Sequence, residues 1–189
     1  SDFGDTTKGK IAFRWQALEN IAFRGAFSTG FKAPTLGQSN VRNVTTAFGT
    51  GGELIDRATL PPTDPVSQLK GGEQLTPEES ESITFGVVAD FDNGLFITAD
   101  YYNIELTDRI STASGIALTE EDIATLLEQG INDASSFSEI SFFTNDFDTT
   151  TEGVDVVANY SMDMMGGETK FSLAYNWTST EVDRASDNI

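Results

Sequence analysis

Hydrophobic and polar residues alternate through residues 81–110, and the rest of the chain is organised around this stretch. Two alternating runs flank residues 92–94, so the pattern predicts a β-hairpin. A two-residue turn would place Val87 opposite Asp100, whereas a three-residue loop keeps both hydrophobic sets on one face. We therefore predict the three-residue loop, with Gly94 in the left-handed conformation. The predicted pairs are Phe91 with Leu95, Ala89 with Ile97, Val87 with Ala99, and Phe85 with Tyr101.

A second hairpin is predicted for residues 9–28, where the alternation breaks at residues 18–20. A three-residue loop again keeps the hydrophobic residues on one face, with Asn20 in the left-handed position. Arg14 and Arg24 then project from the opposite face, which we expect to be hydrated because arginines are costly to bury in an apolar core. The predicted pairs are Ala17 with Ile21, Trp15 with Phe23, and Phe13 with Gly25.

A third hairpin is predicted for residues 154–178, with Gly166-Gly167 as a two-residue turn. This turn pairs Tyr160 with Leu173, Ala158 with Tyr175, and Val156 with Trp177.

Two long connections separate these hairpins. Residues 30–77 are rich in Pro and Gly and read as a long irregular loop. Residues 108–151 form the other long loop, with one short helix at 118–130 that Thr119 caps. Residues 137–147 are either loop structure or an extension of the following strand above the membrane.

The three hairpins share one plan. Each has a short turn at one end, a long connection at the other, an aromatic-rich apolar face and a polar face. This plan is typical of transmembrane β-barrels of the outer membrane. The expected fold class is all-β: an antiparallel meander of hairpins, part of a large transmembrane β-barrel, with one short helix in a long loop.

Charge and composition narrow the possible functions. The formal net charge is −19, which disfavours binding to nucleic acid or to an anionic surface through a basic patch. There is no cysteine and no histidine, which excludes disulfides, thiolate metal sites and histidine-based catalytic triads within this chain. The sequence contains no run of about 18 apolar residues, so no transmembrane helix is predicted. The first residues have no signal-peptide character.

Four segments spread over nearly the whole chain carry a further signal: FRGAFSTGFKAPTLGQ (23–38), LTPEESESITFG (75–86), ADYYNIELTDRI (99–110) and FFTNDFDTTTEGVDVV (142–157). In sequence and in order, these segments resemble the barrel of TonB-dependent outer-membrane receptors.

This resemblance implies a nutrient importer in the cell outer membrane. Such receptors have a barrel of about 22 strands around a plug domain, and the TonB energy-coupling complex acts through the plug. The implied substrates are siderophore-bound iron, cobalamin or a glycan, and the implied partners include outer-membrane lipid. Residues 1–189 lack the plug and a final aromatic strand, so we expect them to be an internal segment of the C-terminal half of a barrel.

The candidate site residues lie on the polar faces of the hairpins. Arg14, Arg24, Asp100 and Asp155 are expected to face the lumen, where they could contact substrate or the plug. The alternative is that they are polar only because the lumen is hydrated. Five aromatic residues are expected in the interfacial girdle or on the lipid face, or else in the core of a soluble sheet. They are Trp15, Tyr101, Tyr160, Tyr175 and Trp177.

Other chemistry has weaker support. Gly30, Ala33 and Pro34 are expected to shape the exit from a strand into the long loop. Acidic clusters at 78–81, 120–122 and 146–148 could bind calcium, but none has the spacing of a known calcium loop, and solvated acidic surface is the simpler interpretation. Glu152 and Asp155 could be imagined as a glycosidase dyad, but no pocket is discernible around them. No enzyme activity, cofactor or metal is predicted.

A rival hypothesis is a soluble or surface-exposed β-sheet module that binds carbohydrate or protein through the same loops. In that case a second sheet must cover the aromatic face. A receptor barrel instead presents this face to lipid.

Overall fold

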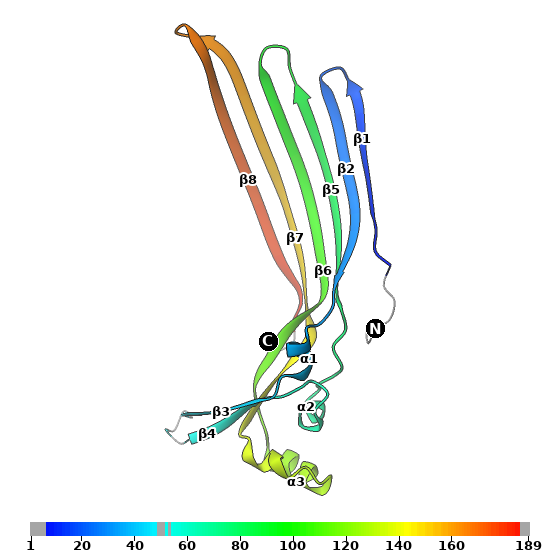
Figure 1. Cartoon of the computed structure of the whole chain (residues 1–189), viewed down its shortest axis with the longest axis vertical. Helices are drawn as coiled ribbons and strands as arrows, with labels where there is room; N and C mark the ends of the chain where they lie inside the picture. The colour runs from blue at the N-terminus through cyan, green and yellow to red at the C-terminus, as the bar shows by residue number, and fades with distance from the viewer. Residues whose placement is uncertain (1–6, 49–51, 53, 186–189) are drawn as a thin grey trace.

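The computed structural model describes residues 7–48, 52 and 54–185, and six long antiparallel strands dominate it (Figure 1). These strands lie in the order β1-β2-β5-β6-β7-β8 and form one curved sheet, which we call the wall. The short turns are all at one end of the wall. The strands are β1 (Lys10–Leu18), β2 (Ile21–Lys32), β5 (Glu78–Asp90), β6 (Leu95–Ala117), β7 (Glu139–Met164) and β8 (Gly167–Ala185).

The two long connections fold together at the other end of the wall. We call this region the cap and define it as the described residues of 33–77 and 111–144. A short hairpin of β3 and β4 joins the sheet there, because β4 pairs in parallel with the start of β7. The cap elements are α1 (Leu36–Asn40), β3 (Asn43–Phe48), β4 (Leu54–Thr59), α2 (Pro65–Leu69), α3 (Glu120–Glu128) and the 3-10 helix η1 (Asn132–Ser136).

The hairpin at residues 81–110 has the predicted register. Phe85 pairs with Tyr101, Val87 with Ala99, and Ala89 with Ile97. The Phe91 N–H donates to the carbonyl of Leu95 at 2.8 Å. Gly94 has a φ of 83°, so the three-residue loop is confirmed.

The first hairpin is partly different from the prediction. The pairs of Trp15 with Phe23 and Phe13 with Gly25 are confirmed, but Leu18 rather than Ala17 pairs with Ile21. Ala17 therefore lies in a bulge, and Asn20 is not left-handed. The Gln16 side-chain amide donates to the carbonyls of Leu18 at 2.8 Å and Glu19 at 3.3 Å. These bonds satisfy the carbonyls of the tighter turn.

In the third hairpin the predicted turn is displaced by one residue, so every pairing is wrong by two. Tyr160 pairs with Phe171, and Met164 with Gly167. The turn residues are Met165 and Gly166, with φ of 55° and 82°. A turn with two left-handed residues matches the twist of the flanking strands. A displacement of two leaves every side chain on its predicted face.

The second long loop is shorter than predicted. Strands β6 and β7 continue to Ala117 and from Glu139, so residues 137–147 are mostly an extension of the strand rather than loop. Helix α3 lies within the predicted range, with Thr119 as its N-cap and Gly130 left-handed after its end. The first loop is not irregular throughout, because it contains β3, β4 and two further short helices.

The hydrophobic core of the described residues lies in the cap. Ala58, Leu60 and Val66 come from the first connection, and the remaining members come from the second. These are Ala113, Leu126, Ala134, Phe137, Ile140 and Phe142. Because the two connections share one core, they fold as a single unit.

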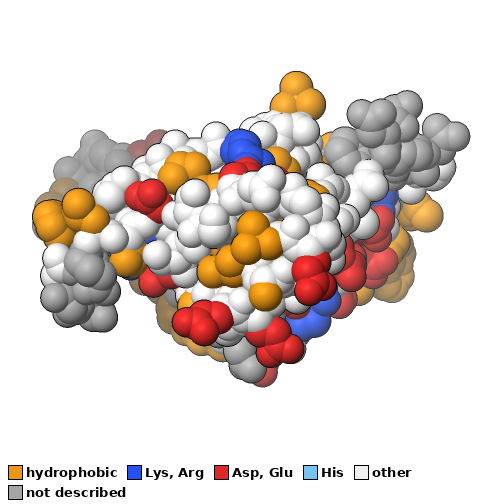
Figure 2. Space-filling view, turned by 90° about the horizontal axis from the view of Figure 1, so that it is seen from below, with side chains coloured by type: hydrophobic (Ala, Val, Ile, Leu, Met, Phe, Trp, Pro, Cys, Tyr) orange, Lys and Arg blue, Asp and Glu red, His pale blue; other side chains and the backbone are white. Residues whose placement is uncertain are grey.

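Ion pairs reinforce this unit from outside the core, and acidic and basic side chains are visible on the face of the molecule seen from below (Figure 2). Lys70, after α2, contacts Asp122 of α3 at 2.5 Å, and Arg42 contacts both Asp64 and Asp133. The hydrogen bond from Lys70, followed by those from Thr119, lowers the pKa of Asp122 to about 2. Asp122 also accepts from the Thr119 backbone at 2.8 Å, completing the capping box of α3.

The depressed pKa of Asp122 gives a pH-dependent prediction. Its stabilising contribution is fully present above its ordinary value near pH 4 and is lost as the pH falls through about 2. In the intact protein, Asp122→Asn should speed pepsin cleavage within residues 119–131 several-fold at pH 4. This difference between variant and wild type should diminish as the pH falls through about 2. Glu121→Gln, one residue away in α3, is the control and should behave like the wild type.

Candidate functional site

The wall has one apolar face. Strand register aligns the hydrophobic residues in rows that cross the sheet. Trp15 stacks on Phe23 with ring centroids 5.8 Å apart, and Phe23 on Phe85 at 6.1 Å. Trp15 and Phe85 remain exposed, at 62% and 50%, and Phe23 between them is partly buried. One row consists of Phe13, Gly25, Phe85, Tyr101, Val154 and Trp177.

All five aromatic residues proposed for the girdle lie on this apolar face. Tyr160 lies in a row close to the short turns, whereas Tyr101 and Trp177 lie in a row nearer the cap. The Tyr101 hydroxyl donates to Glu152 at 3.1 Å. The polar end of Tyr101 therefore points toward the hydrophilic part of the strands.

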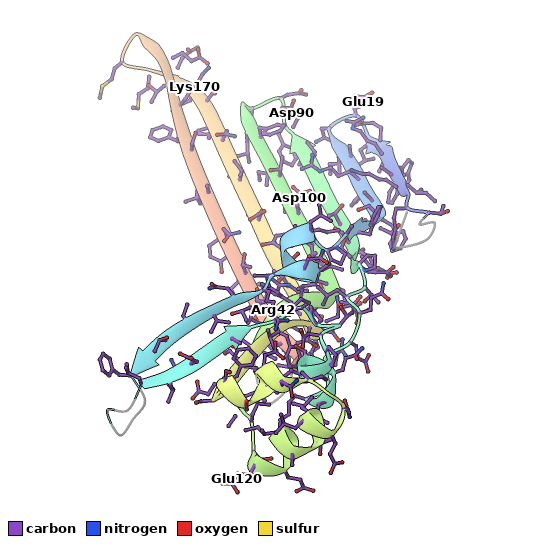
Figure 3. All side chains as sticks on the ribbon, turned by 60° about the horizontal axis from the view of Figure 1, so that its bottom comes forward. Glu19, Arg42, Asp90, Asp100, Glu120 and Lys170 are labelled. Carbon is purple, nitrogen blue, oxygen red and sulfur yellow. The ribbon has the colours of Figure 1, made fainter. Side chains whose placement is uncertain are left out.

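The four predicted site residues share one row on the opposite, polar face. Register aligns Arg14, Arg24, Gly86, Asp100, Asp155 and Asn176 across six neighbouring strands. Figure 3 shows Asp100 on the wall, with Glu19, Asp90 and Lys170 toward the short turns and Arg42 and Glu120 in the cap.

Two members of this row neutralise each other. The Arg24 guanidinium donates two hydrogen bonds to Asp100, from Nε to Oδ1 at 2.8 Å and from Nη2 to Oδ2 at 2.6 Å. These residues are on β2 and β6, with β5 between them. The bridge passes over Gly86, where a Cβ would overlap with Asp100 Oδ1. Gly86 therefore makes room for a bidentate ion pair that spans a strand.

The next row uses the same device with uncharged groups. Tyr102 lies over Gly153, and its hydroxyl bonds to the Thr178 hydroxyl at 2.6 Å. Here the bridge runs from β6 to β8 across β7. Two glycines thus let long polar side chains connect strands that are not neighbours.

Arg14 and Asp155 remain as charges outside this ion pair. Asp155 accepts a hydrogen bond from the Asn176 amide at 2.5 Å. Arg14 makes no ion pair among the described residues, and it borders an open pocket of about 300 Å³ with Gln16, Glu19 and Asp90. The row therefore offers one cation on β1 and one carboxylate on β7 to a partner.

A second group of interacting polar residues was not predicted from the sequence. We call it the hub and define it as Thr76, Glu78, Asp108, Asn145, Asp148 and Arg184. All but Arg184 belong to the motifs quoted above, so their presence in those motifs was a usable signal. Their convergence depends on contacts between segments 32 to 76 residues apart, which no local pattern reveals.

Asn145 is the central residue of the hub. Its side-chain amide donates to the backbone carbonyls of Thr76 at 2.9 Å and Asp108 at 2.6 Å, and its oxygen accepts from the Thr76 N–H at 2.8 Å. One side chain thus ties the entry to β5 to both β6 and β7.

Charged groups surround Asn145. Arg184 donates to Asp148 at 2.6 Å and to Asp108 at 2.9 Å, and its hydrogen bond holds the pKa of Asp148 below its usual range. Glu78 accepts from the Ile110 N–H and from Lys32, each at 2.9 Å. The hub therefore joins β2, β5, β6, β7 and β8 at one level.

The geometry gives little support to a glycosidase dyad or to a metal site on the acidic clusters. Glu152 and Asp155 lie on opposite faces of β7, since Glu152 meets Tyr101 on the apolar face and Asp155 meets Asn176 on the polar one. They cannot form a carboxylate dyad. Within residues 7–48, 52 and 54–185, no group of three or more acidic residues is arranged to hold a metal ion.

Known proteins share the sequence pattern and the fold of this chain. The family described as "TonB dependent receptor-like, beta-barrel" matches residues 1–189. This chain belongs to the TonB-dependent receptor family. Members of the family are outer-membrane transporters and not enzymes.

Solved structures share the fold. The siderophore receptor PirA from Pseudomonas aeruginosa superposes with a TM-score of 0.62 at 17% identity, covering 97% of this chain and 30% of that chain. The RagAB peptide transporter gives a TM-score of 0.59 at 14% identity, covering 95% of this chain and 18% of that chain. This chain therefore spans less than a third of either structure. No curated protein matches its sequence.

In the part of the chain that the structure describes, no helix has the length and apolar character needed to cross a membrane.

The role of Gly86 can be tested by adding a methyl group. Gly86→Ala should displace Asp100 from Arg24 and lower the stability of the receptor by about 1–3 kcal/mol, since overpacking also strains the sheet. The temperature at which the folded barrel loses its fast gel mobility in SDS measures this change. Gly167→Ala is the control, because a Cβ there meets no atom within 4 Å. Equal melting of both variants would contradict the role of Gly86.

Proposed function

We propose that the receptor carrying this segment imports a scarce nutrient across the outer membrane by active transport coupled to TonB. The nutrient classes are siderophore-bound iron, cobalamin and glycan, and the similarity to RagAB adds peptides. The observation that carries this proposal is the polar row of the wall beneath a folded cap. With this row facing the lumen, a hydrophilic solute can pass through the barrel, and the cap forms the surface that the solute meets first.

The polar row itself is suited to the plug rather than to a small solute. Arg14 and Asp155 lie four strand spacings apart, which corresponds to about 19 Å. A small molecule does not bridge that span, but a folded domain that fills the lumen does. Arg24 and Asp100 lie between them and are already neutralised. We infer that the plug presents a carboxylate to Arg14 and a cation to Asp155.

Uptake measurements test the transport proposal. Cells whose receptor gene is deleted, with and without the restored gene, are offered radiolabelled iron on a panel of siderophores, labelled cobalamin, a labelled oligosaccharide and a labelled oligopeptide. We expect energy-dependent uptake of one probe class, lost when TonB is absent. If the receptor reaches the outer membrane and its presence changes uptake of none of the probes, the proposal is wrong.

The plug contact is tested separately at Asp155. Asp155→Asn removes the charge but keeps the shape, so uptake of the accepted probe should fall several-fold while surface binding of that probe is retained. Asp163→Asn, on the same strand beside the short turn, is the matched control and should transport normally. Equal uptake rates in Asp155→Asn and wild type would contradict the proposed contact between this carboxylate and the plug.

A further inference from the structure

The hub lies where the ladders of the wall lose their regular register. The pairing of β6 with β7 shifts between Leu106 and Arg109 and again before Ile110. The pairing of β7 with β8 shifts between Asp148 and Thr149. Irregularities in two adjacent ladders therefore occur at one height, between the wall and the cap. Bulges of this kind bend strands and interrupt their pairing.

The backbone at this level is also unusual. Asp108 has a φ of 52°, a left-handed conformation that is uncommon outside glycine. Its N–H donates to the Asp148 carboxylate at 2.8 Å instead of to a ladder carbonyl. A side chain thus replaces the regular strand bond at the point where β6 changes direction. Such a conformation persists because surrounding contacts hold it, and here those contacts are the hub.

The cap on one side of this level is a single unit. Its core draws on both long connections, and three ion pairs link them, namely Lys70 with Asp122, Arg42 with Asp133, and Arg57 with Glu139. The wall on the other side is held by continuous antiparallel ladders. The β6–β7 ladder crosses the zone between these two parts with a shifted register, and side chains of the hub add further connections there.

There is also open space next to the hub. An open pocket of about 390 Å³ lies between the hub and residues 71–74, which precede β5. It is lined by Gly71, Glu73, Gln74, Thr76, Asp108, Thr144, Asn145 and Arg184. None of these residues belongs to the core of the cap, so the cap can shift at this pocket without first breaking its own core.

We propose that the hub is a joint on which the cap tilts as one body over the mouth of the barrel, and that Asn145 is the positioning residue that holds its resting orientation. The side-chain bonds of Asn145 connect β7 with β6 and with the segment that enters β5 across the irregular level, so their loss frees the joint while leaving the wall and the cap core intact. Hinges generally consist of a few residues at the ends of elements that absorb backbone rotation. This proposal does not depend on which nutrient the receptor carries.

Distance measurements between spin labels test the joint in the full-length receptor in outer-membrane vesicles. The segment has no cysteine, so labels are introduced by Ser179→Cys on β8 and Glu128→Cys on α3, with any cysteine elsewhere in the receptor replaced. We expect a narrow cap-to-wall distance distribution in the otherwise unchanged receptor. Asn145→Ala should broaden this distribution and shift its mean by several ångströms.

Two controls separate a joint from a general loss of structure. Asn159→Ala removes another asparagine of β7, which accepts from Ser172 at 2.8 Å within the wall, and it should leave the distribution narrow. A second label pair, Gln68→Cys with Glu128→Cys, reports the distance between α2 and α3 inside the cap, which should stay narrow in every variant.

Three results would overturn the proposal. They are an unchanged cap-to-wall distance in Asn145→Ala, equal broadening in Asn159→Ala, and broadening of the distance within the cap. The last result would make Asn145 a folding element of the cap and not a positioning residue of a joint. Retention of fast gel mobility in SDS shows that each variant has a folded barrel.

Discussion

The period of two along a β-strand is the constraint on which this structure depends. In lipid, backbone N–H and C=O groups have no water to bond, so each strand must pair with its neighbours over the full membrane span. Once pairing is complete, alternate residues point to opposite faces, and one face must be apolar while the other can be polar. The rows that contain Trp15 and Phe85 on one face and Arg24 and Asp100 on the other follow directly.

Glycine extends what this regular arrangement can do. In an uninterrupted sheet a side chain reaches its immediate cross-strand neighbour, about 5 Å away. Above Gly86 and Gly153 the surface is lowered, and Arg24 and Tyr102 reach past one strand to the next. The polar face thereby gains cross-links that are perpendicular to the strands. These links decide which charges are free to meet a partner and which are already satisfied.

Long alternating runs predicted the wall from sequence, but they did not determine every register. The hairpin closed by Gly94 was predicted correctly, because only the three-residue loop kept the hydrophobic residues of both strands on the same face. At Gly166 a displacement of two left both faces unchanged, so the pattern could not distinguish the alternatives. The bulge at Ala17 depends on the Gln16 side chain. Strands β3 and β4 were not predicted, because each has only six residues and β4 joins the sheet through a non-local parallel pairing with β7.

The candidate site shows the same division. Polar-face positions could be assigned to Arg14, Arg24, Asp100 and Asp155, because parity along a strand is a local property. Their alignment in one row, and the ion pair of Arg24 with Asp100, depend on partners up to 76 residues away. The hub was visible in the sequence only as separate motif fragments. Its geometry arises from strand irregularities that the pattern of residues does not encode.

The location of the hydrophobic core has a consequence for biogenesis. The cap buries its apolar residues against one another, whereas the wall leaves its aromatic rows open. Water alone can therefore drive the cap to collapse, but the wall gains its full stability only when hydrocarbon chains cover its outer surface. A single polypeptide thus contains parts that mature in different solvents. An insertion machinery must keep the exposed strands from associating while the loops between them are already able to condense.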